Sequence, residues 1–133
     1  MKFVKVFFLV GIVSLLMSSC VKKTESYLEG QWERVNLTGR EKTIQVWKFD
    51  GETLSIYHLD TLNSPNTLTF VDKGNYKVKL DGTNVSFETS SFYSTGDHDK
   101  RFNAKYTIYK RKQDILGFID ERGFFYEFIR YTK

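Results

Sequence analysis

The chain has 133 residues, with 20 Lys and Arg, 16 Asp and Glu, and a formal net charge of +4 at pH 7. This length suits a single domain. Its basic and acidic residues are interspersed and form no basic stripe of the kind that nucleic-acid-binding proteins show, so we expect no nucleic acid as a partner. Aromatic residues make up 17% of the chain and favour β-strands over helices.

The N-terminal segment has the layout of a secretory signal peptide. Lys2 and Lys5 precede the uncharged, apolar residues 6–17, and small residues follow. The apolar run is shorter than the about 20 residues that cross a bilayer comfortably. We therefore predict a removable leader over residues 1–19 and a short polar tether over residues 20–27.

Cys20, the only cysteine in the chain, directly follows Ser18 and Ser19, with Met17 before them. These residues resemble the lipobox of bacterial lipoproteins, although Leu is more usual where Met17 stands. The resemblance implies that a lipid on the Cys20 thiol attaches the mature chain to a membrane. The alternative is a secreted protein that is cut near Ser19 and keeps a free thiol, which is unusual in an oxidising compartment.

The residues after the cysteine bear on the membrane to which such a lipoprotein goes. In Gram-negative lipoproteins, an Asp directly after the cysteine resembles a signal for retention in the inner membrane. Here Val21 follows the cysteine instead. Lys22 and Lys23 follow, where surface-exported lipoproteins of anaerobes often carry acidic residues. The resemblance therefore predicts an outer-membrane lipoprotein of the cell envelope, on the periplasmic leaflet rather than the surface.

From residue 28 onward, short runs of alternating apolar and polar residues are separated by turn signals. Asp50-Gly51 and Asp81-Gly82 are strong hairpin signals, because a type I′ turn needs positive φ at both central positions. Further hairpins are expected near residues 110–113 and 120–123. The predicted strands cover residues 30–37, 42–49, 53–59, 74–80, 84–90, 101–110, 114–119 and 124–131.

Eight antiparallel strands joined by tight turns predict an all-β fold over residues 28–133. The simplest closure is an up-and-down eight-stranded β-barrel, which leaves no exposed edge. A two-sheet β-sandwich is the alternative. Two stretches interrupt the pattern and are expected to flank a barrel mouth: residues 60–72, which contain the only proline and a short apolar run at 68–71, and residues 90–100. Around Thr61 the sequence Asp-Thr-Leu resembles an O-glycosylation acceptor, and a chance match explains it equally well.

Leu28-Glu29-Gly30-Gln31-Trp32 opens the first predicted strand with a Gly-x-Trp motif. The motif resembles the start of the lipocalin and lipocalin-like families. This resemblance implies that Gly30 allows a tight turn into the barrel and that Trp32 closes one end under an Arg, either Arg130 of the last strand or Arg122. The Thr-Asp-Tyr-like turn of ligand-carrier lipocalins has no match at residues 110–114, so the closer resemblance is to small lipocalin-like lipoproteins of Gram-negative anaerobes.

Candidate catalytic groups are few. His58 lies on an apolar face of a predicted strand, where packing is the more common role. Asp97-His98-Asp99 contains possible metal ligands, but adjacent residues on an exposed loop are more often solvated. No phosphate-binding loop or hydrolase motif is present in the sequence. We therefore expect neither an enzyme nor a metal or cofactor site.

Two functions remain. The first is binding of a small apolar or amphipathic molecule inside the barrel, because such pockets are largely apolar. The second is an interaction or inhibitor module of the envelope, with a barrel filled by its own side chains and an exposed apolar face, such as residues 115–119 or 124–129, against a partner protein. The candidate wall residues for the first are Trp47, Tyr57, Tyr76, Phe87, Tyr106, Ile108, Tyr126 and Phe128.

Overall fold

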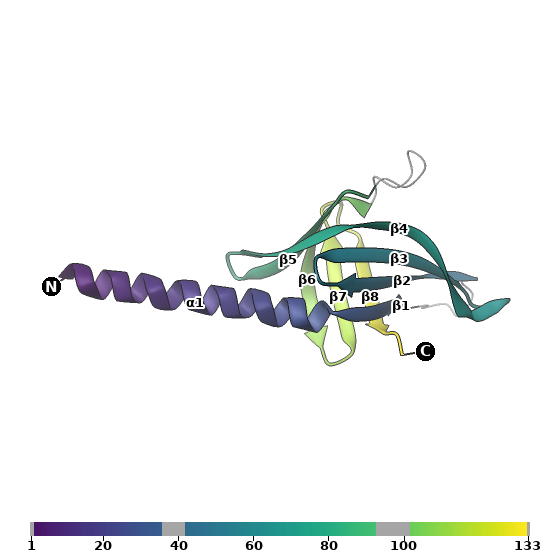
Figure 1. The fold of residues 1–133 in the computed structure, drawn as a ribbon, viewed down its shortest axis with the longest axis horizontal. Helices are drawn as coiled ribbons and strands as arrows, with labels where there is room; N and C mark the ends of the chain where they lie inside the picture. The colour runs from purple at the N-terminus through teal and green to yellow at the C-terminus, as the bar shows by residue number, and fades with distance from the viewer. Residues whose placement is uncertain (1, 36–41, 93–101, 133) are drawn as a thin grey trace.

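The computed structural model describes residues 2–35, 42–92 and 102–132 (Figure 1). One helix precedes eight strands in these ranges. The elements are α1 (Lys2–Leu28), β1 (Gly30–Arg34), β2 (Thr43–Asp50), β3 (Thr53–Asp60), β4 (Ser64–Asp81), β5 (Asn84–Ser90), β6 (Lys105–Lys112), β7 (Ile115–Asp120) and β8 (Phe125–Arg130).

The eight strands form one continuous antiparallel sheet in sequence order. Each strand pairs with the next, and β8 returns to pair with β1 through Trp32 and Arg130. The sheet therefore closes into a barrel-like ring without a break that would divide it into two sheets. The predicted all-β, antiparallel, eight-stranded fold is confirmed.

The hairpins lie where the turn signals predicted them. Gly51 and Gly82 have φ of 62° and 63° in the β2–β3 and β4–β5 turns, a backbone conformation that glycine adopts without strain. The β6–β7 turn uses Gln113, with φ of 51°.

One strand is longer than predicted. β4 begins at Ser64, so residues 64–72 are strand rather than loop. Pro65 is tolerated because it stands second in the strand, where the register with β3 shifts between Leu59 and Asp60. β6 begins later than predicted, at Lys105.

Aromatic side chains fill the interior of the ring. Trp47 and Phe49 of β2 point inward, and the intervening strand positions point outward. The outward side chain Val46 joins a second cluster with Ile44, Leu59 and Tyr131. Other side chains cover both faces of β2, which explains why apolar residues occupy both.

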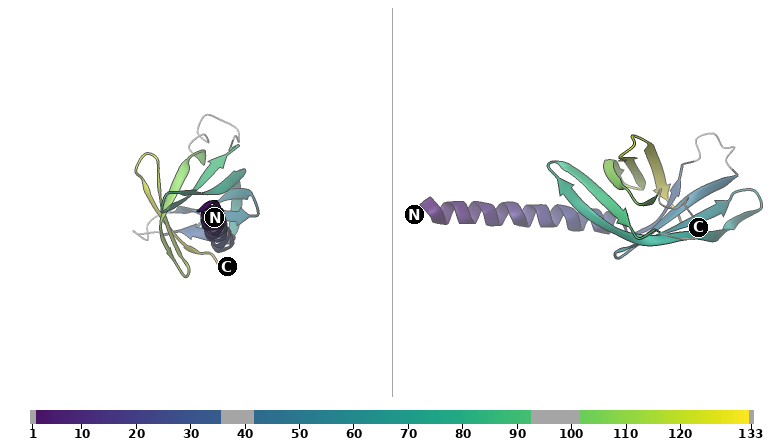
Figure 2. Two further views of the ribbon diagram at one scale, coloured as in Figure 1. Left: turned by 90° about the vertical axis from the view of Figure 1, so that its left-hand side faces the viewer. Right: turned by 90° about the horizontal axis from the view of Figure 1, so that it is seen from above.

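Helix α1 is docked at one end of the ring, which we call the closed end (Figures 1 and 2). Thr24 and Leu28 are fully buried there, and Val21 and Tyr27 pack against the core. The β4–β5 hairpin reaches alongside the helix in both figures. The segment that we predicted as a tether is thus helical, and its last two turns belong to the folded core.

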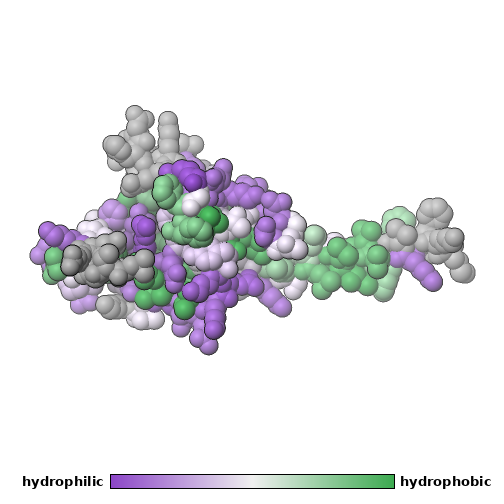
Figure 3. Space-filling view, turned by 180° about the vertical axis from the view of Figure 1, so that it is seen from behind, coloured by the Kyte–Doolittle hydropathy of each residue, from purple (hydrophilic) through white to green (hydrophobic). Residues whose placement is uncertain are grey.

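The rest of α1 projects away from the ring and exposes apolar side chains (Figure 3). By length and composition alone, the segment Phe7–Leu28 could cross a membrane. A signal sequence near the N-terminus has the same properties, so this helix fits the predicted leader as well as an anchor.

Candidate functional site

Trp32 and Arg130 seal the closed end. The guanidinium carbon of Arg130 lies 3.7 Å from the centroid of the fully buried Trp32 ring. Arg130 Nη1 donates to the Glu29 carbonyl at 2.7 Å, and Trp32 Nε1 donates to the Leu28 carbonyl at 2.8 Å. A Cβ on Gly30 would lie 3.0 Å from Arg130 Nη1. The structure therefore brings together Gly30, Trp32 and Arg130, whereas Arg122 lies elsewhere.

The docked helix adds side-chain bonds to this seal. Arg111 Nη1 donates to Thr24 Oγ1 at 2.6 Å, and the Tyr27 hydroxyl donates to the Ile115 carbonyl at 2.5 Å. Thr24 Oγ1 also donates to the carbonyl of Cys20 at 3.0 Å. Cys20 therefore lies one helical turn from a residue that is fixed to the ring.

Most of the predicted wall residues fill the ring rather than line a hollow. Trp47, Tyr76, Phe87, Tyr106 and Phe128 are each at most 5% exposed, and Ile108 and Tyr126 pack against them. Their ring centroids approach to between 4.9 and 6.5 Å of neighbouring rings, distances typical of aromatic packing. A long apolar molecule has no space in this interior.

Tyr57 is the exception among these candidates. Ile56 belongs to the main core, so its neighbour Tyr57 points to the other face of β3. There Tyr57 packs against Phe70, with ring centroids 5.9 Å apart. It does not line the interior, which corrects the expectation from sequence. Phe118, which the sequence did not single out, takes a central place and stacks on Phe128 at 5.3 Å.

A small cavity opens at the end of the ring opposite the helix, which we call the mouth. Its volume is about 160 Å³. Trp47 and Tyr106, each 1% exposed, form its aromatic floor. The cavity is lined by Arg34, Gln45, Trp47, Phe102, Tyr106, Arg122 and Tyr126. Three of the eight wall candidates therefore meet at the mouth. They are joined by Arg122, which the resemblance had offered for the closed end, and by Arg34, which sequence reasoning missed.

The rim of the mouth is held by a polar network around Asp120. Its carboxylate, 1% exposed, accepts hydrogen bonds from Arg122 Nη2 at 2.8 Å and from the Tyr126 hydroxyl at 3.0 Å. The backbone N–H groups of Arg122 and Phe124 also donate to it, at 2.9 and 3.1 Å. Burial raises the pKa of Asp120, but these hydrogen bonds outweigh burial and hold that pKa below its usual value. Burial and the hydrogen bond to Asp120 raise the pKa of Tyr126, so at neutral pH the network holds a carboxylate, a neutral phenol and a guanidinium.

Asp120→Asn is expected to destabilise the ring by about 1–3 kcal/mol at pH 7, because the donors that surround this buried carboxylate lose their charged acceptor. The folded-state pKa of Asp120 is lowered, so its stabilisation is present above the unfolded pKa of about 3.9 and is lost as the pH falls through the lower folded value. Urea unfolding at pH 7 and pH 3 should therefore show a smaller difference between variant and wild type at pH 3. Asp114→Asn, whose side chain is 79% exposed, is the matched control with little expected change. Equal destabilisation by Asp120→Asn at both pH values would contradict this assignment.

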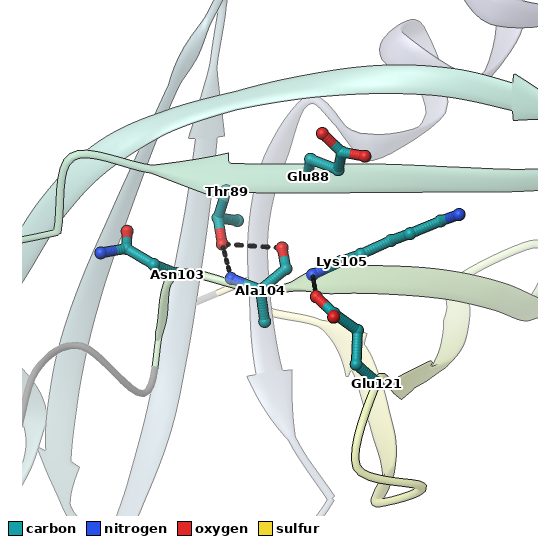
Figure 4. Close-up of a pocket in the computed structure, with 6 residues that line it drawn as sticks. All are labelled: Glu88, Thr89, Asn103, Ala104, Lys105 and Glu121. Carbon is teal, nitrogen blue, oxygen red and sulfur yellow. Dashed lines mark hydrogen bonds between the residues drawn. The ribbon is translucent and has the colours of Figure 1, made fainter.

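A second cavity, of about 370 Å³, lies where β5 and β6 separate (Figure 4). The pairing of β5 with β6 covers Ser86 to Glu88 and ends at Thr89. Thr89 Oγ1 then accepts from the Ala104 N–H at 2.9 Å and contacts the Phe102 carbonyl, while a Glu121 oxygen accepts from the Lys105 N–H at 2.7 Å. The Thr89 N–H also donates to the Ala104 carbonyl at 2.9 Å, so these polar groups satisfy one another where the regular pairing ends. The cavity is a structural feature of the strand junction.

The remaining candidates do not form a site. His58 lies on β3 opposite Gln45 and Thr69, and the Asp97-His98-Asp99 segment lies outside the described residues. Within residues 2–35, 42–92 and 102–132, no group of three or more His, Cys, Asp or Glu side chains could hold a metal ion. Thr61 lies in the β3–β4 turn, where its hydroxyl donates to the Lys42 carbonyl at 3.2 Å.

Comparison of the chain with protein-family models, with curated proteins and with solved structures finds no match. The chemistry of the mouth is therefore the basis for assigning a function.

Proposed function

We propose that this chain is a membrane-anchored, lipocalin-like lipoprotein of the bacterial cell envelope that binds a small amphipathic molecule. The ligand proposal rests on the cavity at the mouth. It combines an apolar floor of Trp47 and Tyr106 with polar groups of Arg34 and Gln45. Binding sites for small molecules typically combine apolar walls with a few placed polar groups.

The size of the cavity limits the ligand. Its volume of about 160 Å³ is below the roughly 300–1,000 Å³ of pockets that enclose a drug-sized molecule. The interior beneath it is occupied by aromatic rings, with Phe118 fully buried at the centre. We therefore propose a ligand that inserts one flat or short apolar group at the mouth, rather than one enclosed within the ring.

The anchor in this proposal is a lipid on Cys20, with the outer membrane as the favoured location and the periplasmic leaflet as the favoured face. The lipobox-like sequence before Cys20 supports it, and so does the apolar helix that precedes the cysteine. Because Thr24 is fixed to Arg111, the anchor would hold the closed end near the bilayer and direct the mouth away from it. Cys20→Ser should move the protein out of the detergent phase in phase partitioning.

An interaction or inhibitor module is the second candidate, and it is favoured by an exposed apolar face on the outside of β6 and β8. Tyr109, Phe125 and Ile129 are 48%, 66% and 39% exposed, and the rings of Tyr109 and Phe125 are in contact at 5.4 Å. Figure 3 shows apolar side chains grouped among polar ones on the face of the ring opposite that of Figure 1. Such patches often contact a partner protein.

Native mass spectrometry of the protein incubated with an envelope extract tests the ligand proposal. We expect a reproducible small adduct on the wild type that is lost in Gln45→Phe, which fills the mouth. Lys48→Phe, on the opposite face of the same strand, is the matched control and should keep the adduct. An adduct that persists in Gln45→Phe would contradict the mouth as the site, and a clean apo mass throughout would favour the interaction module.

A further inference from the structure

We infer that the ligand of the mouth is an anion, with a carboxylate or phosphate group bound by Arg34, a step that rests on the ligand site proposed above. Arg34 ends β1, and its guanidinium carbon lies 5.4 Å from the centroid of the Tyr126 ring. Arg34 and Arg122 both line the cavity. Two cations therefore meet at a site with an aromatic floor.

The charges of the described residues at the mouth do not cancel. Asp120 supplies the one carboxylate among the described residues that line the cavity or bond to its rim. This carboxylate already accepts hydrogen bonds from Arg122 and Tyr126. Within the described ranges, Arg34 forms no ion pair with a carboxylate. The described residues of the mouth thus carry an excess positive charge at a partly buried position.

The geometry of a guanidinium fits this ligand class. It presents N–H donors in a planar fork that matches a carboxylate or a phosphate with two parallel hydrogen bonds. Arg34 lines the same cavity as Gln45, whose side-chain oxygen accepts from Trp47 Nε1 at 3.0 Å. The amide N–H₂ group of Gln45 then remains to donate to the same anion. The aromatic floor of Trp47 and Tyr106 accepts the apolar part of the molecule.

The position of the mouth favours a dissolved anion over a lipid headgroup. α1 and Cys20 lie at the closed end, and Arg34 lies at the far end of β1 from the helix (Figure 1). A bilayer that holds a lipid on Cys20 is therefore on the other side of the ring. A free aromatic or short-chain carboxylic acid is the occupant that we propose.

Calorimetric titration of the full chain in phosphatidylcholine nanodiscs tests this with two probes of the same shape, indole-3-acetate and the neutral indole-3-acetamide. We expect the acetate to bind roughly tenfold more tightly than the amide, as a charge-assisted hydrogen bond predicts. Arg34→Gln should abolish that preference, and Arg34→Lys, which keeps the charge without the fork, should retain part of it. Lys48→Gln on the outer face is the control and should leave the preference unchanged, and melting curves establish that each variant is folded.

Equal binding of both probes by the wild type and by Arg34→Gln would overturn the anion while leaving the ligand site intact. If neither probe bound, the native adduct persisted and flotation with phosphatidylglycerol vesicles failed, the anion would again be overturned. Loss of both the adduct and the calorimetric signal would overturn the proposed function itself. The protein in nanodiscs could instead float with phosphatidylglycerol vesicles, in a way that depends on Arg34, while it fails to bind indole-3-acetate. That result would support the anion and assign it to a lipid headgroup.

Discussion

A chain that begins at Glu29 is expected to melt roughly 20 °C below one that begins at Val21. The eight residues between them include Leu28, which is fully buried, and the Leu28 carbonyl accepts the indole N–H of Trp32. Loss of a buried leucine side chain costs about 2–5 kcal/mol, and a buried donor without an acceptor adds about 1–3 kcal/mol. Thermal melts followed by circular dichroism measure the difference.

A control variant tests whether the exposed face of this segment also contributes to stability. The triple variant Lys22→Ala, Lys23→Ala and Ser26→Ala changes only exposed positions of α1 and should melt within a few degrees of the wild type. If the chain beginning at Glu29 melted as high as the longer one, residues 21–28 would not be part of the core, in keeping with the tether predicted over residues 20–27.

Phe118→Ala is expected to cost about 3–5 kcal/mol of folding free energy, the usual range for a fully buried phenylalanine. Phe118 packs against Trp47, Phe87 and Tyr106 at centroid distances of 5.4, 5.2 and 5.2 Å, so its removal leaves a void that no single neighbour can fill. An apolar cavity of this kind stays dry and takes small apolar molecules. We therefore expect benzene to raise the Tm of Phe118→Ala but not that of the wild type.

Phe125→Ala is the matched control, since it removes the same side chain from the neighbouring strand at a position that is 66% exposed. Its stability should change by about 0.5 kcal/mol or less. A wild-type protein that bound benzene as well as Phe118→Ala does would contradict a filled interior.

The strands and hairpins could be predicted because their signals are local. Asp50-Gly51 and Asp81-Gly82 specify turns by backbone conformation alone, and strict alternation specifies which side chains share a face. The docked helix was not predicted, because its buried residues Thr24 and Leu28 lie in a polar segment and one of them is a threonine. Its helical form depends on packing against the ring, which local patterns do not report.

The site was predictable only in part. Aromatic residues at inward positions could be identified from sequence, but whether they line a hollow or fill it depends on how the ring closes and on the summed volume of side chains such as Phe118. Arg34 stands two positions after Trp32 on β1, so the two side chains lie on the same face of the strand. The inward direction of Arg34 could therefore be predicted from sequence. Its place at the mouth could not be predicted, because the closure of the ring sets it beside Tyr126, 92 residues further along the chain (126 − 34).

The chain contains two tryptophans, Trp47 at the mouth and Trp32 at the closed end, so ¹⁹F NMR of protein labelled with 5-fluorotryptophan reports on both ends of the ring at once. On titration with indole-3-acetate, the proposed site predicts a saturable shift of the Trp47 signal while the Trp32 signal stays in place. A shift of Trp32 instead, or no shift of Trp47 at saturating ligand, would contradict a ligand site at the mouth.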